Sequence, residues 1–155
     1  MKSPTATAVS NLLRVEDRAR DKTVGARFLR RAARILVANL QIPGGSDLSI
    51  FLVGDTRMAR LNASLVGHEG TTDVITLDYA MDGVLAGEIY ICVPEAKRQA
   101  KRFRVPARRE AMRYAVHGVL HMLGYDDTTP AKRLKMKREE NRLVGVVERA
   151  LRQGS

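Results

Sequence analysis

Residues 117–127 read HGVLHMLGYDD, and this stretch contains two of the chain's three histidines. Four residues of an α-helix advance about 400°, so His117 and His121 are expected on one face, one turn apart. Gly124 favours a left-handed backbone conformation, which would end the helix and turn the chain back. Asp127, six residues after His121, is then expected to bring a carboxylate oxygen to the two imidazoles.

Two imidazoles and one carboxylate in this arrangement can bind one divalent transition-metal ion. Three protein ligands leave a coordination position for water, as in hydrolytic metal sites. A bare His-x3-His pair is also consistent with two ordinary surface or core histidines. The following glycine and carboxylate favour a metal site formed by His117, His121 and Asp127, with zinc as the expected ion and nickel as an alternative.

The spacing His-x3-His-x2-Gly-x2-Asp is also that of the metzincin zinc peptidases. In those peptidases the residue after the first histidine is a glutamate that acts as the general base. Gly118 occupies that position here. A zinc peptidase is therefore the least favoured of the hydrolases that this pattern allows.

The same stretch resembles the HGxLHLxGYDH signature of the YbeY family of bacterial metal-dependent endoribonucleases. Further matches to that family occur in the same order along the chain, and the resemblance covers roughly Leu48 to Leu151. The family motif LN…RG…TDVLSF is matched by Leu61-Asn62, Gly67 and Thr72–Thr76. The family motif GDI is matched by Gly87-Glu88-Ile89. The resemblance implies a zincin-like fold. It also implies metal-dependent cleavage of single-stranded RNA in ribosomal RNA maturation and ribosome quality control, with ribosomal RNA or the small ribosomal subunit as partner.

Three positions depart from the family pattern. Asp127 replaces the third histidine of the signature, and Glu88 replaces the aspartate of GDI. Val66 replaces the arginine before the glycine of RG, a residue linked to activity in the family. Arg57 and Arg60, shortly before this position, are candidates to supply the missing cation to RNA.

Two further residues are candidates for roles at the site. Asp73 belongs to the Thr-Asp patch of the family signature and is the candidate general base. His68 lies in a glycine-rich loop, where it is either solvent-exposed, in contact with an RNA phosphate, or a substitute metal ligand for Asp127.

The composition predicts a single globular domain. The 155 residues are 45% hydrophobic, which is typical of a folded protein, and we expect a loose tail at 1–7 followed by one domain at 8–155. The formal net charge of +10 favours a polyanionic partner such as RNA. The single cysteine, Cys92, and the lack of an apolar leader or membrane segment favour the cytoplasm, without a membrane partner. The sequence gives no indication of the oligomeric state.

Apolar periodicity predicts an α+β fold, a small mixed sheet of about four strands packed by helices. Strands are expected at Leu48–Val53, Asp73–Tyr79 and Val84–Val93, the last two antiparallel across a turn at 81–83. The segment Ala8–Val15 fits either an edge strand or the start of a helix. Helices are expected at Asp21–Leu40, from an Asp55 or Thr56 cap to Leu65, from Pro94 to about Arg104, from Pro106 to Leu123, and from Pro130 after a Thr129 cap.

Two classes of function remain open from the sequence. The first is a metal-dependent endoribonuclease in which a metal-activated water attacks an RNA phosphodiester. The second is a ribosome-associated RNA-binding or assembly factor with a structural metal, an alternative that Val66 favours because the activity-linked cation is absent.

Overall fold

A four-stranded mixed sheet forms the centre of the described part of the chain, in the order β1-β2-β4-β3. The computed structural model describes residues 11–42, 44–66, 72–79 and 84–154. The strands are β1 (Leu12–Asp17), β2 (Ser46–Val53), β3 (Val74–Asp78) and β4 (Leu85–Cys92). β1, β2 and β4 are parallel, and β3 pairs antiparallel with β4. The predicted α+β class and the antiparallel pairing of the last two strands are confirmed.

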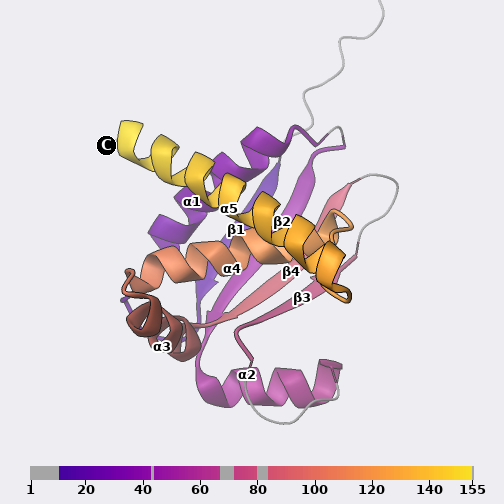
Figure 1. Cartoon of the computed structure of the whole chain (residues 1–155). Helices are drawn as coiled ribbons and strands as arrows, with labels where there is room; N and C mark the ends of the chain where they lie inside the picture. The colour runs from indigo at the N-terminus through magenta and orange to yellow at the C-terminus, as the bar shows by residue number, and fades with distance from the viewer. Residues whose placement is uncertain (1–10, 43, 67–71, 80–83, 155) are drawn as a thin grey trace, which may run out of the picture.

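Most of the helical structure lies over one face of this sheet (Figure 1). α1 (Ala26–Leu40), α4 (Ala107–Met122) and α5 (Pro130–Gln153) contact one another and lie over one face. α3 (Val93–Phe103) leads from β4 into α4, while α2 (Asp55–Leu61) continues into the π-helical turn η1 (Asn62–Val66). Figure 1 places α2 at the end of the sheet away from α5.

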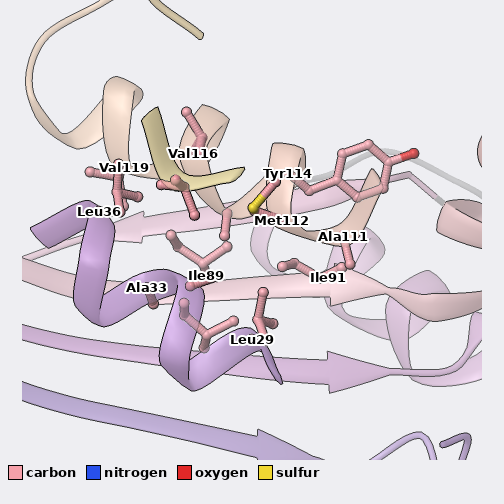
Figure 2. Packing of buried hydrophobic residues seen from close by; sticks show 14 of the residues in the cluster. Leu29, Ala33, Leu36, Ile89, Ile91, Ala111, Met112, Tyr114, Val116 and Val119 are labelled. Carbon is pink, nitrogen blue, oxygen red and sulfur yellow. The ribbon is translucent and has the colours of Figure 1, made fainter. Parts of the chain in front are cut away.

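The central strands bury side chains on both faces, because each face has its own apolar cluster. Ile89 and Ile91 of β4 point toward α1 and α4 and belong to the larger core (Figure 2). Tyr90 and Cys92, the alternate residues, join a smaller cluster with Met58 of α2 on the opposite face. Burial on both faces explains why β2 and β4 have nearly continuous apolar sequences.

Two glycines allow the C-terminal half of α4 to lie close to the sheet. A Cβ atom at Gly118 would lie 2.8 Å from Cδ1 of Ile89. One at Gly87 of β4 would lie 2.7 Å from Cε of Met122 in α4 and 2.2 Å from the carbonyl oxygen of Leu77 in β3. These distances are shorter than van der Waals contact, so these positions exclude larger residues. The close packing fixes the helix that carries the two histidines against β3 and β4.

The start of α1 differs from the prediction. The helix begins at Ala26 after Gly25, which has φ of 83°, and not at Asp21. The Asp21 carboxylate accepts hydrogen bonds from the Thr23 backbone and side chain, and it forms an ion pair with Lys97. These local bonds stabilise a turn in place of the first helical turn.

The short helix that follows β2 also differs from the prediction. Its N-cap is Gly54, without a side-chain cap, and neither Asp55 nor Thr56 serves this role. Asp55 lies inside the first turn, where its carboxylate pairs with Arg98 of α3 and gains from the helix dipole. The α-helix ends at Leu61, and the chain reaches Val66 as a π-helix, where an α-helix to Leu65 was expected.

Other elements agree with the sequence. In the segment Ala8–Val15, residues 12–15 belong to an edge strand, β1, while residues 8–10 lie outside the described residues. Thr129 accepts a hydrogen bond from the Lys132 amide as the N-cap of α5. The 1–7 tail, the 81–83 turn and His68 lie outside the described residues. Among the residues that are described, no helix has the length and apolar composition of a bilayer-spanning segment.

Candidate metal centre and adjoining cavity

The C-terminal end of α4 places His117 and His121 one turn apart on one face, and the chain then reverses. The amide of Tyr125 donates to the carbonyl of Leu120 at 3.0 Å, and Gly124 adopts a φ of 96°. This positive φ is the left-handed conformation that the glycine was expected to supply. The reversal returns Asp127 to the histidines.

His117, His121 and Asp127 form a cluster whose potential ligand atoms all lie within 4.8 Å of one another. The two Nε2 atoms are 3.1 Å apart, and Nε2 of His121 lies 3.8 Å from Oδ2 of Asp127. About a third of the His121 side chain is exposed, so the cluster faces solvent from the edge of the core.

This geometry fits a tetrahedral metal ion. Zinc–nitrogen bonds of about 2.05 Å at the tetrahedral angle place two nitrogen ligands roughly 3.3 Å apart, close to the spacing of the two Nε2 atoms. The third donor is a carboxylate oxygen, and three protein donors leave one position for water. The donor set of His117, His121 and Asp127 therefore suits zinc or a similar divalent ion.

A buried carboxylate orients the first of these histidines. Oε1 of Glu140, on α5, lies 2.9 Å from Nδ1 of His117. A carboxylate beside Nδ1 favours the tautomer that carries its proton there, which leaves the Nε2 lone pair directed at the cluster. Glu140 lies where the outer carboxylate lies in carboxylate–histidine–metal arrangements.

Glu140 is also the centre of a charge network. Its Oε2 accepts hydrogen bonds from Arg113 at 2.8 Å and from Lys137 at 3.0 Å, and the residue is only 4% exposed. Burial raises the pKa of this carboxyl, but the hydrogen bonds from His117, Lys137 and Arg113 outweigh it and lower the pKa to about 2. The carboxylate is therefore ionised throughout the physiological pH range.

Asp126, the neighbour of the third ligand, stabilises the turn. Its carboxylate accepts hydrogen bonds from the backbone amide and the hydroxyl of Thr128, and it lies 3.6 Å from Nζ of Lys132. The bonds from Thr128, first that of its side chain, lower the pKa of Asp126. This turn connects the cluster to the start of α5.

A cavity of about 440 Å³ opens beside the cluster. His117 and Asp127 line it together with Asp73, so the candidate general base shares a cavity with two of the three candidate ligands. Oδ1 of Asp73 accepts a hydrogen bond from the Val74 amide at 2.8 Å, which fixes the carboxylate at the start of β3.

The structure does not bring the two candidate RNA-binding arginines to this cavity. Arg57 and Arg60 are exposed on α2 and do not line it. Arg113, Arg133 and Lys137, from α4 and α5, are the cations that do. Position 118, which carries the general base in the metzincins, faces Ile89 and Thr76 of the sheet.

The role of Glu140 was not predicted from the sequence. A signal for Glu140 exists in the sequence, because it is an acidic residue at helical spacing within the apolar series Met136, Leu143, Val144 and Val147, all of which are buried. An acid in such a series needs a buried partner. The sequence does not show that this partner is His117, 23 residues earlier on another helix.

Comparisons with known proteins agree with this geometry. The family model described as Endoribonuclease YbeY matches residues 14–148. Relatives named Endoribonuclease YbeY include one from Chlorobium phaeovibrioides, 35% identical over 77% of this chain and 80% of the relative, and one from Anaeromyxobacter, 36% identical over 87% of this chain and 72% of the relative. The solution structure of TM1509 from Thermotoga maritima has the same fold, with a TM-score of 0.68 and 23% identity over 92% of this chain and 93% of that one. The chain therefore belongs to the YbeY family.

Proposed function

We propose that this protein is a metal-dependent endoribonuclease whose metal ligands are His117, His121 and Asp127. This proposal rests on the close approach of the three side chains. The Nε2 atoms of His117 and His121 are 3.1 Å apart, and the turn at Gly124 brings the carboxylate of Asp127 beside them. Membership of a family whose relatives are named endoribonucleases gives the reaction class.

A divalent ion bound by these ligands would lower the pKa of its water toward neutrality and polarise a phosphoryl oxygen. Asp73 lines the same cavity, which supports the proposal that its carboxylate accepts a proton from an attacking water. Glu110 also lines the cavity, but it lies two helical turns from His117, roughly 10 Å along the axis, which is too far for that role.

The cations of the cavity give the chain its means of binding phosphate. Lys137 and Arg133 are exposed on α5, and Nε of Arg133 lies 3.4 Å from the backbone oxygen of Asp127. Cations at this place can neutralise charge that develops on phosphorus. These cations supply the positive charge that the family pattern places on an arginine, where this chain has Val66. A contact of Arg57 or Arg60 with RNA stays a prediction.

Single-stranded RNA is the proposed substrate, and ribosomal RNA or the small ribosomal subunit is the proposed physiological one. The net charge of +10 supports a polyanionic partner. If Z phosphates are neutralised, the logarithm of affinity for a single strand should fall with the logarithm of salt at a slope of about −0.7Z. The cytoplasmic location and the domain boundary at residue 8 likewise stay predictions from the sequence.

The test measures metal content and RNA cleavage on the same preparations. We expect about one equivalent of metal in the wild type and metal-dependent cleavage of a labelled single-stranded RNA, since one ligand set binds one ion. His121→Ala should lose both, whereas Asn39→Ala, a surface change on α1 purified identically, should retain both. Cleavage by His121→Ala at the wild-type rate in the absence of metal would contradict the proposed mechanism.

A further inference from the structure

One stripe of α4 continues from the metal cluster into the cavity. Glu110, Tyr114 and His117 follow one another at helical spacing, and all three line the cavity of about 440 Å³. This volume lies in the range of small-molecule sites, roughly 300 to 1,000 Å³. The stripe therefore joins a candidate metal ligand to two polar groups that the proposed cleavage chemistry does not use.

The hydroxyl of Tyr114 lacks a hydrogen-bond partner among the described residues. Tyr114 is 5% exposed, and its hydroxyl oxygen is buried. Figure 2 shows the ring extending from α4 with the oxygen at the end away from the other labelled side chains. A buried hydroxyl without a partner is unfavourable, and such groups in native proteins call for an explanation such as a ligand.

Glu110, one turn earlier on α4, is also a buried polar residue. It is 6% exposed, and within the described chain no hydrogen bond or ion pair of its carboxyl is found. Arg113, one turn along α4, donates instead to Glu140 and Asn141. Burial raises the pKa of Glu110 and outweighs the nearby positive charges of Arg113 and Lys137, which lower it.

An exposed aromatic side chain completes this part of the cavity. Phe103, the last residue of α3, is 60% exposed and lines the same cavity as Glu110 and Tyr114. The guanidinium of Arg102 lies 5.8 Å from its ring centroid. Exposed aromatic rings beside cations are surfaces on which unpaired nucleobases stack.

We propose that this part of the cavity is a guanine subsite beside the metal centre, in which Phe103 stacks the base while Glu110 and Tyr114 bind its polar edge. The inference rests on the proposed function, because it places the base of a nucleotide whose phosphodiester lies at the metal ligands. The distance from Glu110 to His117 along the helix, roughly 10 Å, suits the length of one nucleotide.

The chemistry of the two polar groups selects the base. A carboxylate accepts hydrogen bonds from two neighbouring N–H groups, and the tyrosine hydroxyl donates to a carbonyl oxygen. Guanine presents N1–H and its 2-amino group next to the O6 acceptor, whereas adenine lacks the carbonyl, and cytosine and uracil lack the pair of adjacent donors. The subsite should therefore prefer guanine over the other three bases.

The test titrates metal-loaded protein with guanosine, adenosine, cytidine and uridine, followed by NMR. Guanosine should bind tightest, and Tyr114→Phe should weaken guanosine roughly tenfold, as expected for one lost hydrogen bond. Glu110→Gln should reduce the preference for guanosine, and Phe103→Ala should weaken all four nucleosides. Tyr79→Phe, which alters a tyrosine bonded to Glu88 outside the cavity, is the matched control and should change nothing.

Stability measurements separate binding from folding in these variants. Tyr114→Phe removes an unpaired buried hydroxyl, so the free protein should be no less stable to urea than the wild type. Equal affinity for guanosine and uridine, or a Tyr114→Phe variant with unchanged guanosine affinity, would overturn the subsite. RNA cleavage without guanosine preference would reject only this inference, whereas guanosine preference without RNA cleavage would reject the proposed function.

Discussion

Replacing Glu140 with glutamine tests the network that orients the metal ligands. The variant keeps the size of the side chain but removes the negative charge that Arg113, Lys137 and His117 share. The amide has one acceptor oxygen where the carboxylate has two, so at least one buried donor loses its partner. We therefore expect the variant to have a lower free energy of unfolding and a weaker affinity for metal.

The effect on folding can be worked from the carboxyl's pKa. The hydrogen bonds lower it from 4.5 to about 2 against the opposing effect of burial, and at 1.36 kcal/mol per pKa unit this corresponds to roughly 3 kcal/mol. Because the folded-state pKa is depressed, this stability is fully present above pH 4.5 and is lost as the pH falls toward 2. At pH 7 the variant should be about 3 kcal/mol less stable than the wild type.

The effect on metal binding follows from the contact with His117. Loss of an outer carboxylate partner typically weakens metal affinity by about 10- to 100-fold. Competition with a chelator measures this affinity, and urea unfolding of the metal-free protein at pH 7 and pH 3 measures stability. Glu139→Gln is the matched control: Glu139 pairs with Arg142 on the surface, where an ion pair contributes about 0 to 1 kcal/mol.

Two results would contradict this role of the Glu140 carboxylate. One is a Glu140→Gln variant that binds metal within twofold of the wild type, since the carboxylate would then not orient His117. The other is a stability difference that persists unchanged from pH 7 to pH 3, because the carboxyl of the wild type would then not be the source of the stability.

Three further predictions concern folding and thiol reactivity. Gly118→Ala should lose about 1 to 3 kcal/mol in urea unfolding, because its methyl group would meet Ile89, and unchanged stability would contradict the close packing of α4 on the sheet. Thr129→Ala should lose about 1 kcal/mol with the hydrogen bond from the Lys132 amide, and an unchanged midpoint would show that the cap is not needed. Cys92 is buried, and burial raises its pKa to about 11. Its thiolate fraction at pH 8 should therefore be about 100-fold below that of an ordinary thiol. Rapid reaction of the native protein with a thiol reagent would contradict this.

The elements that could be predicted are those with strong local signals. The apolar runs of β2 and β4, Pro130 with its Thr129 cap, and Gly124 at the end of α4 all act within a few residues of where they stand. The cluster of His117, His121 and Asp127 belongs to this class as well, because its three residues span eleven positions and one reversal. The spacing alone was therefore enough to bring them together.

The remaining features depend on contacts between distant segments. The start of α1 was misplaced because the ion pair of Asp21 with Lys97 and its bond to Thr23 favour a turn over a helix. The role of Glu140 depends on how α5 crosses α4, and the cavity depends on where α3 ends beside both. No periodicity in the sequence encodes these crossings.

We infer that His117, His121 and Asp127 hold one metal ion. The most direct measurement is elemental analysis of purified wild type beside Asp127→Ala and His68→Ala. We expect about one equivalent of zinc or nickel in the wild type, lost in Asp127→Ala and retained in His68→Ala. Metal retained in Asp127→Ala and lost in His68→Ala would contradict this inference, because the third ligand would then come from the glycine-rich loop.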